Sequence, residues 1–92
     1  MISAFTLVKV SIQKNLGIFE KVKKLQTVNE ATLVYGEYDI IIRTNTNNIE
    51  ELNTFIYNTL RKIPHITMTT TMIVAKPNRI QEQTLKEIDP IK

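Results

Sequence analysis

Residues 30–44 read Glu-Ala-Thr-Leu-Val-Tyr-Gly-Glu-Tyr-Asp-Ile-Ile-Ile-Arg-Thr and lie near the middle of the chain. They contain two runs rich in β-branched and aromatic residues, residues 30–35 and residues 38–44, which the pair Gly36-Glu37 separates. A Gly-X pair between two such runs is typical of a tight hairpin, because glycine supplies the positive φ that a type II′ turn needs. The pattern therefore predicts two neighbouring antiparallel strands joined at Gly36.

An amphipathic helix is predicted on each side of this hairpin. Residues 16–25 carry apolar side chains at helical spacing among charged ones, namely Ile18, Phe19, Val22 and Leu25. After a polar break at residues 45–48, Asn48 and Glu51 have the spacing of an N-terminal capping box. The second helix follows with one apolar stripe and ends at Pro64, which cannot continue a helix. The stripe consists of Ile49, Leu52, Phe55, Ile56, Leu60 and Ile63.

The two ends of this central region are predicted strands, because residues 3–12 and residues 66–75 alternate with period two. The complete order is strand, helix, strand, strand, helix, strand, and the two halves echo each other. This order predicts the α+β class and a ferredoxin-like βαββαβ sandwich, in which two helices cover one face of a four-stranded antiparallel sheet. We expect this domain to occupy residues 1–76, followed by a C-terminal tail at residues 77–92 with room for a short helix.

The predicted sheet has a second face that neither helix covers. If the helix-facing residues are Val8, Val10, Ile40 and Ile42, the apolar residues on the uncovered face are Phe5, Leu7, Ile41 and Ile73. A chain of 92 residues buries a modest share of its surface on folding and often gains stability by associating. We therefore expect this face to be buried against a second copy, as a homodimer or part of a larger homo-oligomer.

Composition excludes several classes of function. There is no cysteine, which excludes disulfides, thiolate nucleophiles and cysteine-bound metals, and the single histidine cannot build a metal site alone. The formal net charge of +3 is too small to argue for nucleic-acid binding. No apolar run approaches the roughly 18–20 residues that cross a bilayer, and the N-terminus does not resemble a signal peptide. We expect a soluble cytoplasmic protein without a cofactor or a membrane partner.

Catalytic chemistry finds no support in the residues either. The only serines, Ser3 and Ser11, have no sequence relation to His65 that would suggest a nucleophile and its base. Glu37 and Asp39 stand two apart beside the turn, which does not oppose two carboxylates across a substrate. The sequence predicts no catalytic site.

One combination of motifs carries a family resemblance. Gly36-Glu37-Tyr38-Asp39, a helix, Pro64 and a strand with alternating threonines follow each other in the order found in the C-terminal effector domain, or RAM domain, of the prokaryotic Lrp/AsnC transcription regulators. The chain resembles that domain over residues 4–75, with His65 where the family has glycine after the proline. It lacks the helix-turn-helix, so the resemblance implies a stand-alone RAM protein that does not bind DNA directly.

The resemblance also implies a ligand site, because RAM domains bind amino acids between dimers through the hairpin turn of one subunit and the threonine-bearing strand of a neighbour. The ligand-binding residues so predicted are Gly36, Glu37, Tyr38, Asp39, Thr69 and Thr71. Asp39 would hold the ammonium of the amino acid, and backbone N–H groups of the turn would hold its carboxylate. The same residues also have plainer interpretations, as a turn glycine, a local hydrogen-bond acceptor and ordinary strand threonines.

Three functions are compatible with these features of the sequence. The first is an amino-acid-sensing regulatory domain that modulates transcription through its assembly. The second is a structural oligomerisation partner of full-length Lrp/AsnC regulators. The third is a small dimeric ferredoxin-like enzyme, which is the least favoured because the sequence offers no proton-transfer pair.

Overall fold

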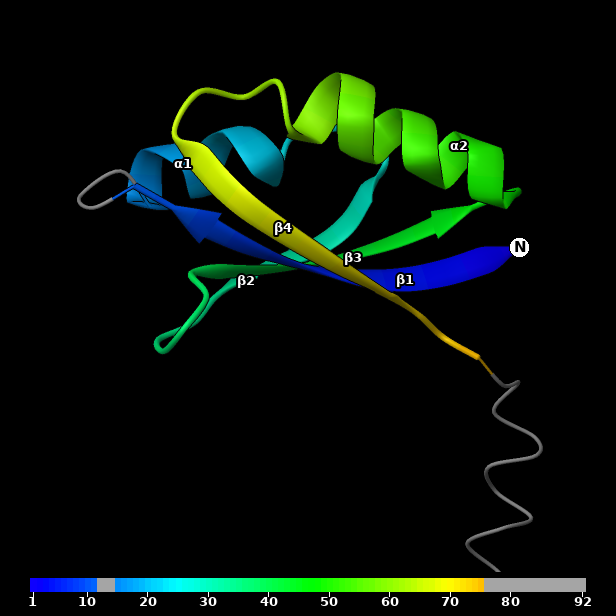
Figure 1. The fold of residues 1–92 in the computed structure, drawn as a ribbon, viewed down its shortest axis with the longest axis horizontal. Helices are drawn as coiled ribbons and strands as arrows, with labels where there is room; N and C mark the ends of the chain where they lie inside the picture. The colour runs from blue at the N-terminus through cyan, green and yellow to red at the C-terminus, as the bar shows by residue number, and fades with distance from the viewer. Residues whose placement is uncertain (12–14, 76–92) are drawn as a thin grey trace, which may run out of the picture.

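The computed structural model describes residues 1–11 and 15–75 of the chain. Its elements are β1 (Ile2–Val10), α1 (Asn15–Val22), β2 (Val28–Leu33), β3 (Ile40–Thr46), α2 (Ile49–Thr54), the π-helical segment η1 (Phe55–Leu60) and β4 (Ile66–Ile73). The strands form one antiparallel sheet in the order β2-β3-β1-β4 (Figure 1). The predicted α+β class and ferredoxin-like βαββαβ order are confirmed. The expected tail at residues 77–92 and the strand residue Ile12 lie outside the described residues.

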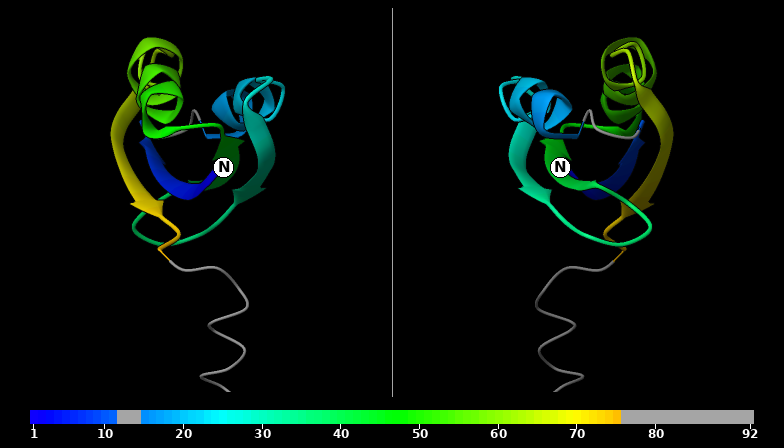
Figure 2. Two further views of the ribbon diagram at one scale, coloured as in Figure 1. Left: turned by 90° about the vertical axis from the view of Figure 1, so that its right-hand side faces the viewer. Right: turned by 90° about the vertical axis from the view of Figure 1, so that its left-hand side faces the viewer.

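The core lies between the sheet and the helices, which sit on the same side of the sheet (Figure 2). Strands β1 and β3 bury alternate residues, as period-two patterning requires. Val8, Val10, Ile40 and Ile42 are all buried, so their predicted helix-facing position is confirmed. The buried apolar cluster consists of Ala4, Val8, Val10, Ile18, Val22, Ile40, Ile42, Leu52, Phe55, Ile56 and Leu60.

The second helix begins where the sequence predicts and then changes its geometry. The Glu51 backbone N–H donates to Asn48 Oδ1 at 2.8 Å, which satisfies one of the unpaired donors of the first turn. The Glu51 carboxylate does not complete a reciprocal capping box, because it accepts from Asn47 Nδ2 at 3.3 Å. In η1 the backbone hydrogen bonds join residues five apart in the sequence, as in a π-helix. The Arg61 N–H, for example, donates to the Ile56 carbonyl at 2.9 Å.

The connection between β2 and β3 is not the tight hairpin that the sequence predicts. It is a loop of residues 34–39, closed by a 2.9 Å hydrogen bond from the Val34 N–H to the Asp39 carbonyl. Gly36 does adopt a positive φ of 136°. The Asp39 N–H donates to the Val8 carbonyl at 2.9 Å, so the last residue of the loop is bonded to β1 as well as to Val34.

The uncovered face differs from the prediction on strand β4. Phe5, Leu7 and Ile41 lie on it as expected, since they alternate with the buried residues of β1 and β3. Ile73 does not, because it pairs with the buried Ala4, and directly opposite residues of paired strands share a face. The β4 residues on the uncovered face are Met68, Thr70 and Met72, which pair with Lys9, Leu7 and Phe5.

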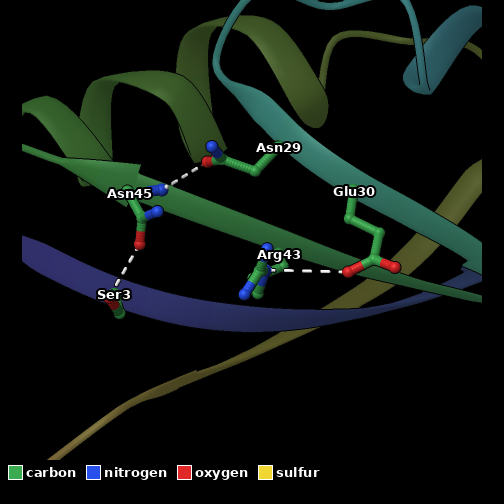
Figure 3. A network of polar contacts seen from close by, with 5 residues as sticks. All are labelled: Ser3, Asn29, Glu30, Arg43 and Asn45. Atoms are coloured by element: carbon green, nitrogen blue, oxygen red, sulfur yellow. Dashed lines mark hydrogen bonds and ion pairs between the residues drawn. The ribbon is translucent and has the colours of Figure 1, made fainter.

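One end of the uncovered face is polar. Ser3 Oγ donates to Asn45 Oδ1 at 2.7 Å, and the Asn45 N–H donates to Asn29 Oδ1 at 2.9 Å (Figure 3). Beside this network, Arg43 Nε lies 3.7 Å from Glu30 Oε1. The apolar residues of the face are thus confined to its middle and to the end near the loop of residues 34–39.

No helix in the part of the chain that the structure describes is both long enough and apolar enough to cross a membrane.

Candidate functional site

The loop of residues 34–39 carries the predicted ligand-binding motif, and it crosses the sheet. Figure 2 shows it on the side opposite the helices, running from β2 toward β4. Lys9 Nζ, on the uncovered face of β1, donates to the Glu37 carbonyl at 2.9 Å and holds the loop over the strand. The loop is therefore attached to β1 through side-chain contacts as well as through the Asp39 backbone.

Asp39 has a structural partner inside the protomer. Its Oδ2 accepts a 2.8 Å hydrogen bond from the Val10 N–H, at the point where the pairing of β1 with β4 shifts register. A carboxylate oxygen is a strong acceptor for a backbone N–H that the strand ladder leaves unpaired. The plainer interpretation of Asp39 as a backbone acceptor is thus correct for Oδ2. The second oxygen retains its capacity to accept from a ligand.

Tyr38 connects the loop to the far edge of the sheet. Its hydroxyl lies 3.0 Å from Thr70 Oγ1 and 3.9 Å from Met68 Sδ. Both partners lie on the uncovered face of β4, so the tyrosine side chain spans β1 on that face. The loop therefore contacts three elements, β3, β1 and β4.

Thr69 and Thr71 are not near Tyr38 in the same protomer. Thr69 pairs with the fully buried Val8, and Thr71 Oγ1 lies 3.0 Å from Oγ1 of the fully buried Thr6. Both threonines share a face, as predicted, but it is the face that the helices cover. The threonine that approaches the loop is Thr70.

Sequence reasoning missed three residues of this region: Lys9, Met68 and Thr70. A signal for Lys9 was present, because it continues the period-two series of Phe5 and Leu7 and places a cation on an otherwise apolar face. The alternating composition of β4 held no such signal for Met68 and Thr70.

The arrangement offers donors and acceptors for a small zwitterion. Among the residues that the structure describes, the backbone N–H groups of residues 36–38 donate no hydrogen bond, and the Lys9 ammonium lies beside them. The Asp39 carboxylate and the hydroxyls of Tyr38 and Thr70 complete the polar set. Within residues 1–11 and 15–75, no group of three His, Cys, Asp or Glu side chains is placed to hold a metal ion.

Comparison with known proteins identifies the family. The family model of the Lrp/AsnC ligand binding domain matches residues 3–85. The HTH-type transcriptional regulator FL11 of Pyrococcus abyssi is 34% identical over 76 residues, which cover 83% of this chain and 50% of FL11. The chain thus spans about half the length of the curated relatives it matches. The relatives that match carry the name of HTH-type transcriptional regulators.

Solved structures agree with the family model. The crystal structure of FFRP-DM1 is 40% identical with a TM-score of 0.77, and the match covers 82% of this chain and all 100% of that one. The transcriptional regulator NMB0573 of Neisseria meningitidis, solved in complex with L-Met, has a TM-score of 0.73 at 19% identity over 82% of this chain and 50% of its own, which shows the common fold alone. Because the family model covers most of the chain, the protein belongs to the Lrp/AsnC ligand-binding domain family.

Proposed function

We propose that this domain is a regulatory module that binds a free amino acid beside the loop of residues 34–39 and modulates transcription through the assembly of its copies. The observation that carries the proposal is the group of backbone N–H donors at residues 36–38, which have no acceptor within the described part of the chain and lie next to the Lys9 ammonium. Clustered N–H donors and a cation form a site for a carboxylate. The α-carboxylate is the part that every amino acid shares.

The rest of the ligand finds complementary groups around the same loop. The free oxygen of Asp39 is available to the α-ammonium, and the hydroxyls of Tyr38 and Thr70 can bond either end. Met68, which is 52% exposed, offers a flexible apolar surface for a ligand side chain. In this proposal Thr69 and Thr71 act only from a neighbouring copy, because their own protomer directs them away from Tyr38.

Assembly is the second part of the proposal. Phe5, Leu7 and Ile41 form an apolar surface on the uncovered face together with Met68 and Met72. An exposed apolar surface of this kind is stabilised when a second copy covers it, which supports a homodimer or a higher homo-oligomer. A ligand that binds at the junction between copies shifts the assembly equilibrium by its difference in affinity for the two states.

Two relatives support the regulatory context. FL11 is an HTH-type transcriptional regulator, so a full-length regulator of the same family is the proposed protein partner, and contact with DNA is left to that partner. This context also supports the cytoplasmic location expected from the sequence. The NMB0573 structure contains L-Met, which supports an amino acid as the class of ligand.

Isothermal titration calorimetry with the common amino acids, on the unmodified protein and on an Asp39→Asn variant, tests the ligand site. Asparagine keeps an oxygen for the Val10 N–H but removes the charge that attracts an ammonium, so folding is retained. We expect at least about tenfold weaker binding, since the lost interaction is a charge-assisted hydrogen bond. The matched control is Glu51→Gln, which removes a carboxylate at the start of α2 and leaves affinity unchanged. Equal affinity in Asp39→Asn would remove Asp39 from the site, and no heat with any amino acid would contradict the proposed ligand.

A purely structural partner is the second candidate function, and one observation favours it. Tyr38, Asp39 and Lys9 already have partners within the protomer, so the loop is ordered without a ligand. Light scattering with and without amino acids separates the two functions, because only the sensing module changes its mass on ligand addition. Co-purification with a full-length Lrp/AsnC regulator in both conditions tests the partner.

A further inference from the structure

Among residues 1–11 and 15–75, no strand pairs with the outer edge of β4, and the register of its backbone groups follows from its pairing with β1. Strand β4 lies at one end of the sheet order, and its inner side pairs with β1. The Val74 N–H donates to the Ser3 carbonyl at 2.9 Å, so it points toward β1. Backbone groups of successive strand residues point to opposite sides. The N–H and C=O groups of Thr70 and Met72 therefore point toward β1, and those of Thr69, Thr71 and Ile73 point outward.

The two edges of the sheet differ in how they are protected. Strand β2 carries the charged Glu30 and a register shift between Val28 and Glu30, both of which hinder pairing with a further strand. Residues 66–74 contain no charged residue and no proline. Exposed apolar side chains also occur on both faces here, since Met72 is 51% exposed on the uncovered face and Ile73 is 46% exposed on the helix-covered face. Only β4 has the features of an edge open to strand addition.

We propose that the β4 edge is an interface at which two copies of this chain pair antiparallel, with Thr70 on the twofold axis. Such pairing continues one sheet into the other, so residues that meet must lie on the same face. On the uncovered face, Met68 then lies opposite Met72 of the second copy, and the two Thr70 residues meet. On the helix-covered face, Thr69 lies opposite Thr71 of the second copy.

This register uses the outward backbone groups and matches the side chains. Thr69 and Thr71 both point their N–H and C=O groups outward, so each Thr69–Thr71 pair exchanges two hydrogen bonds across the axis. A twofold axis at Thr69 or at Thr71 would instead place methionine opposite threonine on the uncovered face. No charged residue lies along residues 66–74, so the two identical strands do not repel each other.

The pairing uses the backbone edge of β4 and not the area of the uncovered face, and it does not require amino-acid binding. It has one consequence for the candidate site, because Tyr38 contacts Thr70 at the proposed axis. The loops of residues 34–39 from both copies would then approach the same junction on one side of the joined sheet.

Single-cysteine variants test the register, because the chain has no native cysteine. Two Thr70→Cys residues at a non-hydrogen-bonded antiparallel pair would have Cα atoms about 4.5 Å apart, which permits a disulfide. We expect Thr70→Cys to form a covalent dimer on oxidation, and Thr54→Cys, at an exposed position of α2, to remain monomeric on denaturing gels. A mixture of Thr69→Cys and Thr71→Cys should give the mixed disulfide. Pairing through the uncovered face cannot explain that product, because both side chains lie on the other face.

Amide hydrogen exchange on the unmodified protein provides an independent measurement. In an isolated protomer the outward amides of Thr71 and Ile73 exchange fast, whereas the Met72 amide is bonded to β1. We expect the first two to be slowed at least about tenfold at high protein concentration and released on dilution, while Met72 stays protected throughout. Fast exchange of Thr71 at every concentration would overturn the proposal. Slow exchange at every dilution would also overturn it, because the protection would then not come from a second copy.

Discussion

Thr44 is fully buried, and its hydroxyl finds no hydrogen-bond partner among the residues that the structure describes. A buried hydroxyl without a partner loses its hydration and gains nothing in return. Thr44→Val keeps the shape and removes this cost, so we expect the free energy of unfolding to rise by about 1–2 kcal/mol in urea denaturation. The control is Thr6→Val, which removes a hydroxyl bonded to Thr71 and should lower stability. A lower free energy of unfolding in both variants would contradict the conclusion that the Thr44 hydroxyl has no hydrogen-bond partner.

His65 is the one non-glycine residue with positive φ in the described chain, at 79°. This conformation crowds a Cβ atom against the backbone and costs about 1–2 kcal/mol for most residues. It also explains why glycine occupies this position in the pattern that the chain resembles. We expect His65→Gly to unfold at higher urea concentration than His65→Ala, by about 1 kcal/mol, because only glycine relieves the strain. Equal stability of the two variants would refute the strain.

Residue roles that depend on local chain geometry were predictable, and roles that depend on distant partners were not. The positive φ of Gly36 followed from its place between two strand-forming runs and is confirmed. The bond from the Val10 N–H to Asp39 could not be foreseen, because it joins residues 29 apart in the sequence through the alignment of β1 with β3. The contact between Tyr38 and Thr70 depends on the same alignment. The ligand-binding roles stay predictions.

The start of α2 provides a prediction at the level of an element. Asn48 Oδ1 accepts from the Glu51 N–H at 2.8 Å. Asn48→Ala removes that acceptor, and we expect a loss of about 1 kcal/mol in chemical denaturation. Asn48→Asp is the control, since aspartate caps equally well and its charge suits a helix N-terminus. If Asn48→Asp lowered the stability of the protein as much as Asn48→Ala, loss of the side-chain cap would not explain the effect of alanine.

Elements with a clear hydrophobic period were predictable, whereas their ends and faces were less so. Both helices and all four strands appear in the predicted order, displaced by a few residues. The π-helical geometry of η1 left no signal, because the stripe around Phe55 and Leu60 is compatible with an α-helix. The face of Ile73 was wrong because apolar residues occur on both faces of β4, Met68 and Met72 on one and Ile73 on the other. The pattern therefore cannot choose a face, and the pairing with β1 decides it.

For the whole molecule, the uncovered face gives a prediction about assembly. Leu7 lies on this face between Ile41 and Thr70, its partners on the neighbouring strands. Leu7→Lys places a charge in the proposed interface on the uncovered face and leaves the core unchanged. We therefore expect a smaller assembly with an unchanged circular dichroism spectrum. Thr54→Lys, at an exposed helix position, adds the same charge and should keep the mass of the unmodified protein. Sedimentation at matched concentrations compares them, and an unchanged mass for Leu7→Lys would contradict that interface.

The charge and the bulge on β2 set a limit on growth. When two identical β4 edges pair, neither edge is left for a third copy. The opposite edge, β2, carries Glu30 and the register shift, which hinder the addition of a further strand. Association through the strand edges alone therefore stops at a pair of chains, because each described sheet offers one open edge and the pairing of two β4 strands occupies both.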